Sequence, residues 1–107
     1  MTSLDKLKVL VVCGRNKKRS LTAEVLFKNH PHLVIRSAGV SSAARHVVSQ
    51  NEIDWADQIW CMETKHAEKL QELFSTTKSI RVLDIPDEYE FMDVELVALL
   101  TAESQYV

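Results

Sequence analysis

Short apolar runs alternate with amphipathic segments along the whole chain. The run from Val9 to Val12 is apolar at every position, which is typical of a strand buried on both faces of a parallel sheet. From Thr64 to Phe74, apolar residues recur at helical spacing with charges between them, which predicts an amphipathic helix. The predicted elements, in chain order, are a strand at 8–12, a helix at 20–29, a strand at 33–37, a short helix at 49–56, a strand at 58–62, a helix at 64–74, a strand at 80–85 and a helix at 94–102.

This order of elements predicts an α/β fold. Strands that alternate with helices through short connections form a parallel sheet, and right-handed crossovers place helices on its faces. We therefore expect a four-stranded parallel sheet with helices on both faces, of flavodoxin-like type. Arg36 within the second strand favours an edge position. Ser20 or Thr22 is the expected cap of the first helix, and Asp93 that of the last.

Composition restricts the classes of protein that fit. A chain of 107 residues with 46% hydrophobic content predicts a single domain over residues 1–107. The net charge of -2 gives no overall attraction to nucleic acid, which makes a nucleic-acid partner an unfavoured but open alternative. Two distant cysteines, with no leader-like segment and no apolar run long enough for a membrane span, predict a cytoplasmic protein without a membrane partner.

The candidate chemistry lies directly after the first strand, in the sequence Cys-Gly-Arg-Asn-Lys-Lys-Arg-Ser at 13–20. Basic neighbours favour the thiolate form of Cys13 and so its use as a nucleophile. A loop between a strand and a helix can direct its N–H groups and the positive helix end at an anion, and Arg19 adds a planar fork of donors that suits phosphate. The other loop residues expected to bind or shape a phosphate site are Gly14, Arg15, Asn16, Lys17, Lys18 and Ser20. The alternative is that Cys13 only packs in the core beside a solvated basic turn.

A second candidate segment, at 83–93, lies after the fourth strand and is rich in acids. Parallel strands end at one edge of a sheet, so this segment should face Cys13 and supply a general acid for the leaving oxygen. The segment holds Asp84, Asp87, Glu88, Glu90 and Asp93, and the residues alone leave open which of them donates the proton. Tyr89 is a candidate ring beside the substrate, with packing against the last helix as the alternative.

Through these two segments, the chain resembles the low-molecular-weight protein tyrosine phosphatases, in a shortened and atypical bacterial form. The family loop C-x-G-N-x-C-R-S-P-T-A-E is similar to C-G-R-N-K-K-R-S-L-T-A-E here. R-S-A-G-V at 36–40, D-W-A-D-Q-I-W-C-M-E-T-K-H-A-E-K-L at 54–70 and I-P-D-E-Y at 85–89 resemble three further family segments in the same order.

The resemblance implies a role for each matching residue. Cys13 becomes the nucleophile, Arg19 the phosphate clamp, Ser20 the thiolate partner and Asn16 a loop support. The alignment of Ile-Pro-Asp makes Asp87 the general acid in preference to Asp84. It also implies a metal-independent phosphatase with no cofactor, acting on a phosphotyrosine protein or a small phosphate ester. The four histidines show no spacing of metal ligands, so no metal site is expected.

The departures from the family pattern keep two alternatives open. Arg15 stands where the family has a loop glycine, Lys18 where it has a second cysteine, and the segment between Gly39 and Asp54 is short, which predicts a more open site. Arg15 and the short segment motivate a phosphate-binding module with weak turnover. The basic rim formed by Lys17 and Lys18 motivates a phosphoesterase that acts on nucleotides or RNA ends.

Overall fold

The computed structural model describes residues 6–105 and contains the predicted order of elements. These are β1 (Leu7–Cys13), α1 (Arg19–Leu26), β2 (Leu33–Gly39), α2 (Gln50–Trp55), β3 (Gln58–Cys61), α3 (Thr64–Phe74), β4 (Ser79–Val82) and α4 (Val94–Ser104). Within this range, no helix combines the length and the apolar character that a membrane crossing requires.

The four strands form one parallel sheet in the order β2-β1-β3-β4. The prediction that β2 lies at an edge is confirmed. The central strand β1 is buried on both faces, with no exposed surface from Val9 to Val12. Because β1 pairs with β2 on one side and β3 on the other, the connections from β1 and β3 leave in opposite directions, which makes this the switch point where parallel sheets bind ligands.

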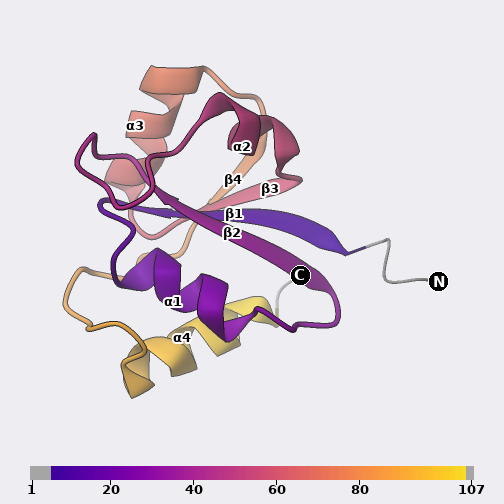
Figure 1. The fold of residues 1–107 in the computed structure, drawn as a ribbon, viewed down its shortest axis with the longest axis vertical. Coiled ribbons are helices and arrows are strands. Elements are labelled where there is room, and N and C mark those ends of the chain that lie inside the picture. Colours follow the sequence, from indigo (N-terminus) through magenta and orange to yellow (C-terminus); the bar gives the residue numbers. More distant parts are fainter. Residues whose placement is uncertain (1–5, 106–107) are drawn as a thin grey trace.

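Helices cover both faces of the sheet, as predicted (Figure 1). On one face, Val9 and Val11 pack in a cluster that includes Leu96 and Leu100 of α4. On the other, Leu10 joins a cluster with residues of α2 and α3. Because helices cover both faces, a ligand can reach the sheet at the loops that follow the carboxyl ends of the strands.

The first helix differs from its prediction at both ends. It begins at Arg19 and ends at Leu26, and its N-cap Lys18 makes no side-chain capping hydrogen bond. The predicted caps are wrong because both hydroxyls are used elsewhere. Ser20 lies beside Cys13, and the Thr22 hydroxyl donates to the carbonyl of Lys18 at 2.6 Å.

The fourth strand is shorter than predicted. β4 ends at Val82 because Asp84 adopts a left-handed backbone with φ 57°. The chain still runs beside β3 beyond this point, since the N–H groups of Leu83 and Ile85 donate to Cys61 and Met62. This continuation brings the acidic segment to the same edge as Cys13.

Candidate active site

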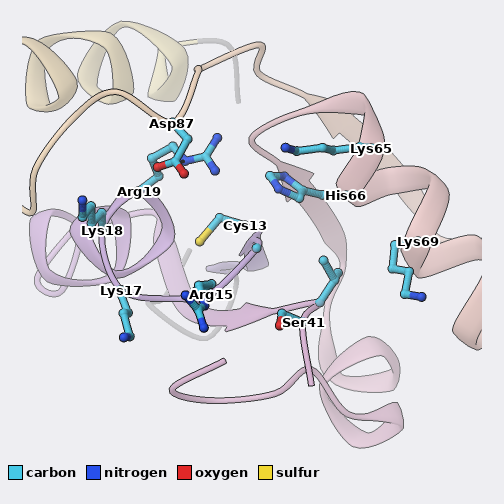
Figure 2. A pocket seen from close by; sticks show the side chains of 12 residues that line it. Cys13, Arg15, Lys17, Lys18, Arg19, Ser41, Lys65, His66, Lys69 and Asp87 are labelled. Carbon is cyan, nitrogen blue, oxygen red and sulfur yellow. Dashed lines mark ion pairs between the residues drawn. The ribbon is translucent and has the colours of Figure 1, made fainter. Parts of the chain in front are cut away.

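A pocket of about 670 Å³ opens at the carboxyl end of β1, with Cys13 in its wall (Figure 2). Its lining comes from the loop after β1, the loop after β2, the first turns of α3 and the segment after β4. The lining residues are Cys13, Gly14, Arg15, Lys17, Lys18, Arg19, Val40, Ser41, Lys65, His66, Lys69 and Asp87. The structure thus brings most of the sequence-predicted site residues together around Cys13.

The Cys13 sulfur sits inside a set of hydrogen-bond donors. The backbone N–H of Asn16 donates to Sγ at 3.2 Å, and Ser20 Oγ lies 3.0 Å from Sγ. Asn16 Nδ2 donates to the same Ser20 oxygen at 2.8 Å, and the Ser20 proton is free to be donated to a thiolate. The Asn16 N–H and the Ser20 hydroxyl are thus both placed to donate to the sulfur.

Asn16 is held in an unusual backbone conformation. Its φ of 56° lies in the left-handed region, which asparagine tolerates better than most residues. Arg45 donates through Nε to the Asn16 carbonyl at 3.1 Å and through a terminal nitrogen to Asn16 Oδ1 at 2.8 Å. Asn16 is itself fully buried and does not line the pocket, so its contribution is to shape the loop.

The short segment after β2 braces the Cys13 loop through its backbone. The N–H groups of Val40, Ser41 and Arg45 donate to the carbonyls of Cys13, Gly14 and Arg15, respectively, each at 3.0 Å. Gly39 must be glycine for this approach, because a Cβ there would lie 2.5 Å from the Gly14 carbonyl oxygen and 2.6 Å from the Ala44 Cβ. The segment therefore supports the loop as well as lining the pocket.

The Arg19 guanidinium is buried and fixed from two sides. One terminal nitrogen donates to Glu63 Oε1 at 2.6 Å and to the carbonyl of Ile85 at 2.8 Å. Burial alone raises the pKa of Glu63, but the hydrogen bond and charge of Arg19 outweigh it and hold that pKa below its usual value. Glu63 is therefore an anion that orients Arg19, a role that the sequence pattern alone did not indicate.

His66 is the histidine that lines the pocket, and it is 2% exposed. Its Nδ1 accepts the backbone N–H of Glu63 at 3.1 Å, which places the proton of a neutral ring on Nε2. Burial, and then the charge of Arg19, lower the pKa of His66 to about 4. At neutral pH, His66 therefore presents a neutral N–H group beside Gly14.

The two candidate acids lie in different places. Asp87 lines the pocket with a side chain that is 66% exposed, and its Oδ1 is 3.9 Å from Arg19 Nε. Asp84 is exposed and lies outside the pocket lining. Position therefore favours Asp87, which Figure 2 shows across the pocket mouth from Lys65 and beside Arg19.

Tyr89 is not beside the site. It is 8% exposed, belongs to the core cluster under α1 and α4, and its hydroxyl donates to Glu95 of α4 at 3.3 Å. The expectation of a substrate-facing ring is therefore wrong in this structure, and the packing alternative is the arrangement found. The hydroxyl is drawn to α4 because Glu95 offers an acceptor there.

The second cysteine and the tryptophan rings take structural positions. Cys61 is fully buried, and burial raises its pKa to about 12, which leaves the thiol inert. Trp60 is buried in the core, and Trp55 lies under the Arg36 guanidinium at 4.3 Å. Within residues 6–105, no group of three or more His, Cys, Asp or Glu side chains is placed to hold a metal ion.

The arrangement can bind a phosphate group against loop N–H groups and Arg19, with a thiolate positioned to attack phosphorus. Several solved phosphatase structures are similar to this chain. The YwlE arginine phosphatase from Geobacillus stearothermophilus matches with a TM-score of 0.76 and 22% identity, over 94% of this chain and 92% of that one. Wzb from Vibrio vulnificus in complex with benzylphosphonate matches with 0.76 and 23%, over 94% and 96%.

A third similar structure is SP-PTP, a low-molecular-weight protein tyrosine phosphatase from Streptococcus pyogenes, with a TM-score of 0.75 and 17% identity over 94% of this chain and 90% of that one. No protein-family model and no curated protein sequence matches the chain. The chain therefore has the fold of the low-molecular-weight phosphatases, which confirms the predicted fold class.

Proposed function

We propose that this protein is a cysteine-dependent phosphomonoesterase that hydrolyses phosphate esters through a cysteinyl-phosphate intermediate on Cys13. The observation that carries the proposal is the environment of the Cys13 sulfur, which accepts from the Asn16 N–H at 3.2 Å and lies 3.0 Å from Ser20 Oγ. A cysteine that only packs in a core needs no such donors. The fold shared with known phosphatases supports the same conclusion.

The proposed reaction has two balanced steps. In the first, the Cys13 thiolate forms a bond to phosphorus, the bond to the ester oxygen breaks, and Asp87 gives its proton to that oxygen. In the second, water attacks phosphorus, Asp87 takes a proton from the water, and the sulfur–phosphorus bond breaks. Inorganic phosphate leaves and the thiolate is restored.

Charge on the transferring phosphoryl group is balanced by Arg19 and the N–H groups of the loop. Arg19 is oriented before substrate arrives, because Glu63 and the Ile85 carbonyl hold one of its terminal nitrogens. Preorganised donors of this kind supply a large part of the rate enhancement in phosphoryl and acyl transfer. The proposed mechanism therefore uses no metal or other cofactor, and its reduced thiol suits a cytoplasmic location.

The proposed reaction is compatible with more than one kind of leaving group. The similar structures include an arginine phosphatase and a tyrosine phosphatase, so the shared fold accommodates both phosphorus–nitrogen and phosphorus–oxygen cleavage. We propose a phosphotyrosine protein or a small phosphate ester as the substrate. The cationic pocket lining specifically favours a highly charged ester, which keeps nucleotides among the candidate substrates.

Hydrolysis of p-nitrophenyl phosphate in the presence of a chelator tests the proposal. We expect turnover that disappears in Cys13→Ser and that falls by about 10²- to 10³-fold in Asp87→Asn, with loss of the basic limb of the pH profile. If the folded wild-type protein binds phosphate but shows no turnover at any pH, the protein is a phosphate-binding module and not an enzyme.

A further inference from the structure

The pocket extends well beyond the phosphate cradle. A volume of about 670 Å³ lies within the range of pockets that bind whole small molecules, whereas the cradle itself holds one phosphoryl group. The additional wall is formed by the first turns of α3, where Lys65 and Lys69 line the pocket together with His66. The leaving group of a substrate bound at Cys13 would therefore contact α3.

The charge of this pocket is opposite to that of the chain. Six cationic side chains and one acid, Asp87, line the pocket, while the chain as a whole carries a net charge of -2. Arg15 and Lys17 form no ion pair with any described residue, but both belong to the loop that surrounds the reacting phosphate. The cations outside that loop are on α3.

Lys65 and Lys69 lie one helical turn apart on α3. Their i, i+4 spacing places them as neighbours on the same face of α3. Lys65 Nζ lies 3.8 Å from Glu63 Oε2 and Lys69 Nζ 3.7 Å from Glu72 Oε1, and the lysine side chains are 70% and 47% exposed. Such exposed and long pairs stabilise little, so both amines are available to an anion.

The same wall lacks the ring that an aryl ester would stack on. Apart from the His66 imidazole, no aromatic side chain lines the pocket within residues 6–105. Tyr89 and Trp60 are buried in the core, and Trp55 stacks against Arg36. The leaving-group side of the pocket is therefore complementary to negative charge and not to an aromatic ring (Figure 2).

We propose that Lys65 and Lys69 form a subsite for a second phosphate group, so that the preferred ligands are small bisphosphorylated compounds. One phosphate occupies the loop at Cys13, and the other lies against α3. A small molecule is favoured over a phosphopeptide because the cations lie within one concave pocket. This inference rests on the proposed function only for the step in which the first phosphate is removed.

Binding to the Cys13→Ser protein tests the subsite without turnover. Isothermal titration calorimetry compares fructose 1,6-bisphosphate with fructose 6-phosphate, and adenosine 3′,5′-bisphosphate with adenosine 5′-monophosphate. We expect at least one bisphosphate to bind about tenfold tighter than its monophosphate, with a preference that weakens at high salt. Equal affinities within both pairs would overturn the proposal.

Single charge-removing variants then locate the subsite. We expect Lys65→Gln and Lys69→Gln, each made in the Cys13→Ser protein, to reduce the bisphosphate preference by about three- to fivefold. Lys28→Gln is the matched control, because it removes one exposed charge near the end of α1 and outside the pocket lining, and it should leave the preference unchanged. A preference that survives both α3 variants would overturn the assignment to these lysines.

Two further measurements separate the possible failures. If a phosphotyrosine peptide with acidic flanks binds tighter than both bisphosphates, the small-molecule class is wrong. Hydrolysis of p-nitrophenyl phosphate by wild-type protein reports on the proposed function alone. Turnover without a bisphosphate preference refutes only the subsite, whereas a lysine-dependent preference without turnover supports the subsite and refutes the phosphatase.

Discussion

Cys13 and Cys61 end adjacent strands of the same sheet, and their surroundings differ completely. Both thiols are free and buried, with 3% and 0% of their surface exposed. Cys13 opens into a loop whose Asn16 N–H donates to its sulfur, with the Ser20 hydroxyl 3.0 Å away. Cys61 lies in an apolar cluster, and burial raises its pKa to about 12. Burial alone therefore does not distinguish the proposed nucleophile from a packing residue in this fold.

The difference arises from the segment that comes after each strand. After β1, the loop at 14–18 turns back over Cys13 and directs its backbone at the sulfur. After β3, the chain runs directly into α3, and its contribution to the site comes from Glu63 and His66. In the proposed mechanism, the end of β1 supplies the reacting sulfur, and the segment after β3 supplies groups that orient Arg19 and surround the pocket.

Alkylation by iodoacetamide tests the difference in reactivity between the two thiols. At neutral pH, a thiol of pKa about 12 is ionised in only about 1 molecule in 10⁵, and Cys61 is also inaccessible. We expect Cys13 to react at least about 10³-fold faster, with loss of activity at one equivalent and protection by inorganic phosphate. If peptide mass spectrometry found equal labelling of Cys13 and Cys61, the two thiols would not differ in reactivity.

Much of this contrast could be predicted from sequence. The apolar run of β1, the position of Cys13 at its end and the spacing to Arg19 placed the loop at the correct edge of the sheet. Local patterns were sufficient because strand, loop and helix come directly one after another. Cys61 was similarly predicted to pack in a core strand, and it does.

The supporting residues could not be predicted in the same way. Arg45 and Glu63 reach Asn16 and Arg19 across sequence separations of 29 and 44 residues, and only the folded chain brings them together. A signal did exist for Glu63, since it is the N-cap residue of α3, the helix that follows the strand paired with β1. Tyr89 was misplaced because its hydroxyl partner on α4 depends on how that helix packs.

Arg45→Leu tests whether the loop after β1 needs its distant support. The substitution removes two hydrogen bonds to Asn16 and frees a strained left-handed residue to relax. We expect kcat/KM for p-nitrophenyl phosphate to fall by about ten- to a hundredfold, with a small change in Tm. Arg36→Leu is the matched control, because Arg36 stacks on Trp55 away from the pocket. Equal losses in both variants would contradict a role specific to the loop.

A pair of glycine substitutions separates the loop from the segment that braces it. In Gly39→Ala, the new methyl group would lie 2.5 Å from the Gly14 carbonyl oxygen, so backbone must move. We expect a loss of about 2–3 kcal/mol in the free energy of unfolding, measured by urea titration. In Gly14→Ala, the nearest group is His66 Nε2 at 3.8 Å, and we expect less than about 1 kcal/mol. Similar losses for both variants would mean that the close approach at Gly39 is not what fixes the loop.

His66 of α3 should make the free energy of unfolding depend weakly on pH. The pKa of His66 is about 4 in the folded protein, below the usual 6.5, so the unfolded chain binds more protons between these values. The contribution of His66 to stability is therefore complete above pH 6.5 and is lost as the pH falls towards 4. Arg19 and Lys65 reinforce this depression, while Glu63 and Asp87 oppose it.

We expect the wild-type protein to lose about 1–2 kcal/mol from this residue between pH 7 and pH 5, measured by urea titration at each pH. His66→Gln should flatten the curve over that interval, whereas His32→Gln, at an exposed position, should leave its slope unchanged. A slope retained in His66→Gln would place the acid sensitivity elsewhere. If the slope is lost in that variant, His66 is the group whose protonation destabilises the protein. The segment after β3 then contributes a neutral imidazole beside the cradle, whereas Cys61 itself contributes nothing to the site.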